Sequence, residues 1–169
     1  HYFEQAISGH DPVDSPIYEN FLAESPRYQD LEKIDEGGAK SIYAVFDEQT
    51  SRPVAMAQLK NLSERKDYEH FLSEAFLTAT LEHPNIIPLY DTGLNDKLEP
   101  YFTMKLIEGK NLQEHILQAK EGNLENYTTQ DIIDIFLKIC DAIAFAHSKN
   151  IIHLDLKPEN IRLGQYGEV

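Results

Sequence analysis

The sequence predicts an α+β fold in which a small sheet is followed by helices. Two observations predict this order: short β-type runs separated by turn residues follow residue 27, and two later segments combine a capping box with a helical period. A content of 41% hydrophobic residues over 169 residues is ordinary for folded protein and argues against disorder throughout. We expect one domain, or part of a larger one.

Charge and cysteine usage narrow the classes of function. The chain has 15 Lys and Arg against 29 Asp and Glu, a formal net charge of −14, so we expect neither a nucleic-acid partner nor an anionic membrane surface. No run approaches the roughly 20 apolar residues of a membrane span. Cys140, the single cysteine, lies in an apolar helical run where we expect it to be buried. A reducing, cytoplasmic compartment is expected.

Five β-type runs are separated by Gly, Pro or acidic turn residues. Residues 1–26 precede them and carry Pro, Asp and Ser without a sustained apolar period, which predicts an irregular lead-in. The runs predict strands at 28–34, 40–47, 52–60, 83–93 and 99–109. A helix is expected between the third and fourth strands, over 62–82, where Phe71 and Ala75 share one stripe and Phe76 lies beside it.

Two capping boxes predict the starts of two further helices. Asn111 with Glu114 predicts the first, and Thr128 with Asp131 predicts the second. The second helix keeps a 3.6-residue apolar period over 129–148, which makes it the longest apolar element of the chain.

The most informative segment follows that long helix and reads HLDLKPEN from His153 to Asn160. It resembles the catalytic loop of protein kinases, whose pattern is H-R-D-L-x-x-x-N, and the KPE run is similar to the serine/threonine version. The resemblance implies that Asp155 accepts the proton of a substrate hydroxyl. It also implies that Lys157 neutralises charge on the transferred group and that Asn160 ligates magnesium.

Upstream segments follow the order of the same family. Glu74 resembles the glutamate of the family's helix αC, and the HPN turn at 83–85 follows it. Met104 resembles the gatekeeper residue, and Lys105 to Ile107 resembles the hinge. The sequence of these segments most resembles that of bacterial eukaryotic-like serine/threonine kinases. The resemblance covers roughly residues 28–169.

This resemblance implies a protein-kinase-like fold. The expected architecture is a five-stranded antiparallel N-lobe sheet with helix αC, followed by the first helices of a truncated C-lobe. The boundaries are a lead-in at 1–26, the N-lobe and hinge at 27–107, and the start of the C-lobe at 108–169. Because the long helix normally packs against later C-lobe helices, its apolar stripe is expected to be uncovered, which predicts self-association or coverage by the rest of a parent protein.

The glycine-rich loop and the third strand depart from the family pattern. The loop G-x-G-x-x-G-x-V reads DEGGAKSI from Asp35, and it keeps only the middle glycine, Gly37. The V-A-I-K pattern of the third strand ends in Ala57, so the phosphate-anchoring lysine is absent. Lys60 lies three residues further along, and an odd offset on a strand places it on the opposite face.

Lys40 takes the place of the third loop glycine. Ile42, two residues later, matches a position that contacts adenine in this family, and residues i and i+2 of a strand share a face. The with-no-lysine kinases supply their lysine from this position, which implies that Lys40 contacts the phosphates and pairs with Glu74. The alternative is a solvated loop lysine, with Ala57 marking an inactive kinase.

Two further departures bear on activity. Leu154 replaces the arginine that receives an activation-loop phosphate in many kinases, so switching by that route is not expected. Arg162 stands where an apolar residue packs under adenine. Its stem can cover the ring while its head reaches solvent or an acid. An occluded nucleotide site is the alternative, and it supports a pseudokinase.

The leading hypothesis is an ATP- and Mg²⁺-dependent serine/threonine protein kinase acting on a protein substrate, with this fragment alone inactive. The alternative is a pseudokinase that acts as an interaction or allosteric module. The retained Asp155 and Asn160 favour the enzyme. The resemblance implies a nucleotide site formed by Gly37, Gly38, Ile42, Ala55, Met104, Lys105, Ile107 and Arg162.

Overall fold

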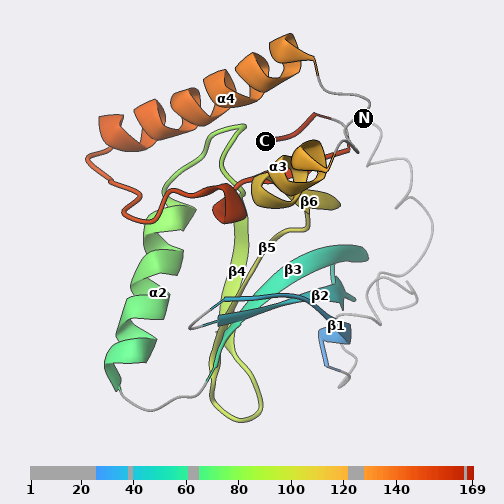
Figure 1. Ribbon diagram of the computed structural model, residues 1–169. Coiled ribbons are helices and arrows are strands. Elements are labelled where there is room, and N and C mark those ends of the chain that lie inside the picture. Colours follow the sequence, from blue (N-terminus) through green and yellow to red (C-terminus); the bar gives the residue numbers. More distant parts are fainter. Residues whose placement is uncertain (1–25, 38–39, 61–64, 122–127, 166) are drawn as a thin grey trace, which may run out of the picture.

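The computed structural model describes residues 26–37, 40–60, 65–121, 128–165 and 167–169. The predicted lead-in, apart from its last residue, and Gly38 lie outside these ranges. Five strands form one antiparallel sheet in the order β1-β2-β3-β5-β4, which confirms the expected sheet (Figure 1). Their bounds are β1 Tyr28–Glu36, β2 Lys40–Asp47, β3 Arg52–Leu59, β4 Leu89–Leu94 and β5 Pro100–Lys105.

In the described part of the chain, three α-helices accompany the sheet, with bounds α2 Arg65–Ala79, α3 Leu112–Lys120 and α4 Thr129–Ser148. Helix α2 lies beside the five-stranded sheet, whereas α4 crosses the end of the molecule farthest from that sheet (Figure 1). A small second sheet pairs β6 (Gly109–Asn111) with β7 (Arg162–Gly164), and the short 3₁₀ helix η2 (Pro158–Asn160) precedes β7. These short elements were not predicted, because three residues are too few to establish a period.

The main core lies between helix α2 and the sheet. Ala57, Phe71, Ala75 and Phe102 are buried together, and the ring centroids of Phe71 and Phe102 are 4.9 Å apart. Phe76, predicted beside this stripe, is 59% exposed and does not contribute to the core. At about 100° per residue, Phe76 lies about 100° around the helix from Ala75, and a single stripe is enough to cover the sheet here.

Both later helices begin as predicted. The Asn111 side chain accepts from the Glu114 backbone N–H, and Thr128 does the same for Asp131; both capping boxes are complete. Cys140 on α4 is exposed, contrary to expectation. The buried residues of α4 are Ala142 and Ala146, so this helix meets the rest of the described chain mainly through its C-terminal half.

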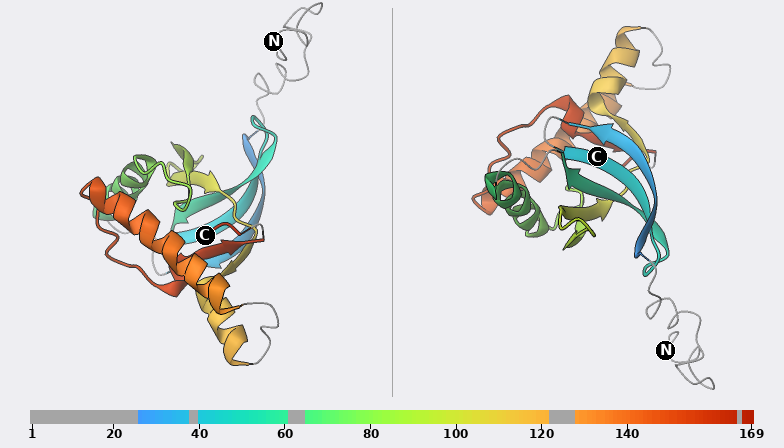
Figure 2. Two further views of the ribbon diagram at one scale, coloured as in Figure 1. Left: turned by 90° about the horizontal axis from the view of Figure 1, so that it is seen from above. Right: turned by 90° about the horizontal axis from the view of Figure 1, so that it is seen from below.

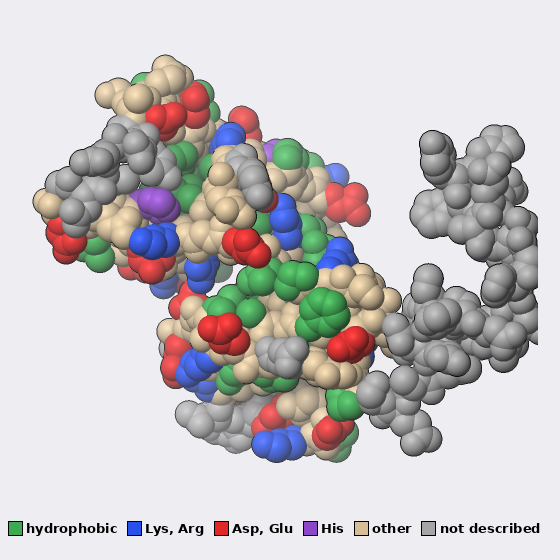
Figure 3. All heavy atoms as spheres, turned by 90° about the vertical axis from the view of Figure 1, so that its right-hand side faces the viewer, with side chains coloured by type: hydrophobic (Ala, Val, Ile, Leu, Met, Phe, Trp, Pro, Cys, Tyr) green, Lys and Arg blue, Asp and Glu red, His purple; other side chains and the backbone are tan. Residues whose placement is uncertain are grey.

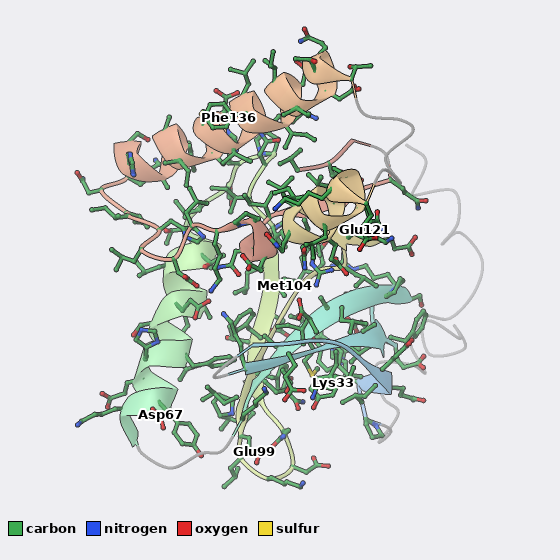
Figure 4. All side chains as sticks on the ribbon, in the orientation of Figure 1. Lys33, Asp67, Glu99, Met104, Glu121 and Phe136 are labelled. Carbon is green, nitrogen blue, oxygen red and sulfur yellow. The ribbon has the colours of Figure 1, made fainter. Side chains whose placement is uncertain are left out.

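Part of the apolar side of α4 is exposed in the described ranges, as predicted. Ile132 and Phe136 are 59% and 63% exposed, and Phe136 is labelled on this helix in Figure 4. Among the described helices, none is long and apolar enough to cross a membrane. On another face of the molecule, acidic, basic and hydrophobic side chains are interspersed (Figure 3).

Strand register brings three of the predicted nucleotide-site residues, Ile42, Ala55 and Met104, onto neighbouring strands. Ile42 on β2 pairs with Ala57 on β3, and Ala55 pairs with Met104 on β5. Ile42 and Met104 both pack against the cluster that contains Ala57. The curved sheet that carries these residues is seen from above and below in Figure 2.

Candidate active site

The catalytic-loop segment brings three predicted side chains into contact. Lys157 Nζ lies 2.9 Å from Asp155 Oδ2. Asn160 Nδ2 donates to the Asp155 backbone oxygen at 2.8 Å and to Asp155 Oδ2 at 3.1 Å. Pro158 opens η2, and its fixed φ suits the first position of a helical turn. The turn places Asn160 back over Asp155, which explains the five-residue spacing of the motif.

The same contacts set the charge of the loop. The Lys157 ammonium, followed by the Asn160 amide, lowers the pKa of the Asp155 carboxyl below its ordinary value. Asp155 in turn raises the pKa of Lys157. Asp155 is therefore an anion at neutral pH, which is the form that accepts a proton. Leu154 is 94% exposed with a φ of 20°, so it presents an apolar side chain where the family has a cation.

Lys40 at the start of β2 meets Glu74 on α2. Lys40 Nζ donates to Glu74 Oε1, and their side chains are 34% and 44% exposed. Lys40 Nζ also lies 5.8 Å from the centroid of the Phe102 ring. Ala57 beneath this region has an exposed fraction of 0%. The structure thus brings together the two charged side chains that the sequence predicted to pair.

Lys60 has a different set of partners. Its Nζ donates to the Gly37 backbone oxygen at 2.6 Å and forms an ion pair with Glu36. Lys33 and Lys60 together lower the pKa of Glu36 to about 2. Lys60 therefore holds the turn that follows β1. Sequence reasoning missed this contact, because Lys60 lies beyond the end of β3 and strand alternation does not fix its direction.

The hinge residues lie at the end of β5. Met104, labelled in Figure 4, is half-buried where β5 leads out of the sheet toward α3. Lys105 Nζ lies 2.9 Å from Glu168 Oε1, and the Lys105 backbone N–H donates to the Pro88 oxygen at 3.1 Å. Ile107, also half-buried, follows before β6. The hinge is thus held both to Pro88, the residue before β4, and to the C-terminal segment.

Arg162 on β7 reaches an acid, one of the outcomes considered from the sequence. Its Nη2 donates to Asp35 Oδ2 at 2.6 Å, and its Nη1 donates to the Gly109 oxygen at 3.3 Å. Asp35 is near the end of β1, at the first position of the loop pattern. The residue expected under adenine is therefore joined to the strand expected above it.

A surface cavity of about 260 Å³ lies beside the hinge rather than in the predicted nucleotide site. It is lined by Pro53, Leu106, Glu108, Gln165 and Glu168. This lining contains none of the residues that the sequence assigned to nucleotide binding. Leu106 is the only residue of the hinge run that contributes to it.

Magnesium coordination is only partly supplied by the described residues. The Asn160 amide nitrogen faces Asp155, which turns the amide oxygen, the atom that a hard cation takes, to the other side. Within the described ranges, no group of three His, Cys, Asp or Glu side chains could hold a metal ion. The described residues therefore supply one ligand of the expected magnesium site, the amide oxygen of Asn160.

Comparison with known proteins shows the family to which the chain belongs. The protein kinase domain family matches residues 28–169. The chain is 38% identical over 155 residues to the serine/threonine-protein kinase PknD of Protochlamydia amoebophila, an alignment that covers 86% of this chain and 16% of that protein. It is 39% identical over 152 residues to PknD of Chlamydia muridarum, covering 85% of this chain and 16% of that protein. The chain belongs to the protein kinase family and spans 16% of the length of these relatives.

Proposed function

We propose that this chain is part of a serine/threonine protein kinase that transfers the γ-phosphate of ATP to a protein hydroxyl. The observation that carries the proposal is the contact of Asp155 with both Lys157 and Asn160. Family membership and the serine/threonine kinases among the relatives support it.

In the proposed reaction, Asp155 accepts the proton of the substrate hydroxyl while the hydroxyl oxygen forms a bond to the γ-phosphorus. The bond between that phosphorus and the β,γ-bridging oxygen breaks, and ADP leaves. Lys157, held beside Asp155, offsets negative charge on the transferred group. Bound Mg²⁺ would neutralise charge on the phosphates, and Asn160 would supply one of its ligands.

We further propose that Lys40 performs the role of the lysine absent at Ala57. The ion pair with Glu74 supports this, because a lysine paired with the glutamate of this helix is a recurring part of the protein kinase active site. Such a charge-assisted contact is worth about 1.5–3 kcal/mol. Its loss in the transition state would slow transfer by about tenfold to over a hundredfold.

A pseudokinase is the second candidate function. The buried Ala57 and the contact of Arg162 with Asp35 favour it, because both remove features that nucleotide binding uses in the family.

We propose two partners for the chain. One is a protein substrate for the enzyme, and the other is a second copy of the chain, joined through the exposed apolar residues of α4.

The first test measures phosphate transfer from labelled ATP by the full-length protein. We expect Asp155→Asn to abolish transfer and Lys40→Ala to reduce it by about tenfold to over a hundredfold. Lys33→Ala is the matched control, since Lys33 is an exposed lysine on β1 paired with Glu36.

A second comparison uses Lys60→Ala, which removes the other lysine beside Gly37. A larger loss in Lys60→Ala than in Lys40→Ala would overturn the relocated-lysine role. Absence of both transfer and Mg²⁺-dependent ATP binding in the wild type would establish the pseudokinase.

A further inference from the structure

Two departures from the kinase pattern meet in one ion pair. The first loop glycine is replaced by Asp35, and the apolar residue under adenine is replaced by Arg162. The structure joins the two side chains at 2.6 Å, although they are 127 residues apart in the sequence. Each substitution alone would place a charge at the nucleotide site, and together they neutralise each other.

This pair spans the space between the two sheets. Asp35 lies on β1 and pairs in register with Ile42, the residue expected above adenine. Arg162 lies on β7 in the small second sheet. Its side chain also donates to the backbone oxygen of Gly109 on the neighbouring strand β6, at 3.3 Å. The pair is thus a direct link between the strand above the predicted nucleotide site and the strand below it.

The distance decides what this link does. A flat ring held between two surfaces needs about 7–8 Å between them, because each contact is about 3.5–4.0 Å. The donor and acceptor of the Arg162–Asp35 pair are 2.6 Å apart, so no ring passes between them. A nucleotide that enters the adenine side must first separate the two side chains.

We propose that Asp35 and Arg162 form a gate on the adenine side of the cleft, and that this gate sets the affinity for nucleotide. The proposal rests on the proposed nucleotide site and adds that its closed form competes with the ligand. The Arg162 side chain is 23% exposed and the Asp35 side chain is 43% exposed, so water screens the pair. Pairs of this kind shift an equilibrium by up to about fivefold, which bounds the effect on apparent affinity.

The test measures binding of adenosine to the full-length protein by isothermal titration calorimetry. Adenosine carries no phosphate, so the change of charge at position 35 does not act through phosphate repulsion. We expect Arg162→Leu and Asp35→Asn each to bind adenosine about two- to fivefold more tightly than wild type. The double variant D35R/R162D restores opposite charges and returns the affinity toward the wild-type value.

Arg52→Leu is the matched control, because Arg52 stacks on Tyr90 at 3.9 Å and takes no part in the gate. Its adenosine affinity should equal that of wild type. Raising the ionic strength should narrow the difference between wild type and Arg162→Leu, since salt screens an exposed pair. Thermal unfolding of each variant, followed in parallel, separates a change in the site from a change in global stability.

Equal or weaker adenosine binding by both single variants overturns the gate. If wild type then still transfers phosphate, the proposed function stands without it. Tighter binding by the variants together with no phosphate transfer by any version supports the gate and overturns the transferase. Failure of every version to bind adenosine overturns the gate, because removing the pair would not have opened the site.

Discussion

At the scale of single residues, the loop carboxylate Asp155 is defined by its two neighbours. Lys157 and Asn160 both contact it, and both stabilise its ionised form. The spacing of the motif predicted these residues, because the whole segment lies within one loop and one helical turn. Its charge state follows from contacts that the same turn creates.

Lys157→Ala should raise the pKa of Asp155 toward the ordinary aspartate value of about 3.9, because the largest cause of the lowered pKa is removed. Side-chain carboxyl ¹³C NMR, with the signal assigned through Asp155→Asn, measures this. Lys157→Arg keeps the charge and should leave the pKa low. A titration of Lys157→Ala at the same pH as wild type would contradict the assigned cause. In both proteins Asp155 remains ionised at pH 7.

At the scale of elements, one arginine ties the start of β1 to two other strands. Arg27 makes two hydrogen bonds of 3.0 Å to Asp47 at the end of β2 and a third to Asp91 on β4. Asp47 is 2% exposed. Burial alone would raise the pKa of Asp47. The hydrogen bonds from Arg27 and Thr50 lower it by more than burial raises it, so the net pKa is below the ordinary value.

Arg27→Ala should lower the free energy of unfolding at pH 7 by about 1.5–3 kcal/mol, because a buried carboxylate loses its charged donor. Since Asp47 has a lowered pKa when folded, this stabilisation is present above about pH 3.9 and is lost as the pH falls through the folded value. The difference between wild type and Arg27→Ala should therefore shrink on acidification. Urea unfolding at pH 7 and near pH 3 measures it.

Arg52→Ala is the control for that comparison, since Arg52 is an exposed arginine at the start of β3. Its effect should stay within about 1 kcal/mol and change little with pH, as for exposed contacts in general. An equal loss in both variants, independent of pH, would show that the buried Asp47 carboxylate is not the source of the stabilisation.

At the scale of the whole molecule, helix α4 leaves an apolar face uncovered. Ile132, Ile133, Phe136 and Leu137 are between 45% and 63% exposed. Contiguous apolar surface of this kind favours association in water. The sequence predicted this exposure from the resemblance, whereas it did not predict the exposure of Cys140 near the middle of the helix.

We expect the 169-residue chain to self-associate increasingly as its concentration rises. Phe136→Asp should shift it toward monomer, because the introduced charge opposes burial of this face. Sedimentation velocity over a range of concentrations measures the change. Phe76→Asp is a matched control, since Phe76 on α2 is 59% exposed and lies on another surface. A strict monomer at high concentration, or equal effects of both variants, would refute association through α4.

The sequence by itself determined the catalytic-loop motif, the two helix caps and the presence of the five strands of the main sheet, since each of these is specified by residues within a few positions of one another. The strand predicted at 83–93 begins only at Leu89. Tertiary structure decided the partners of Lys60 and Arg162 and the outward direction of Phe76. Ion pairs between elements far apart in the chain depend on strand register and on how the two sheets face each other, and no local pattern encodes either.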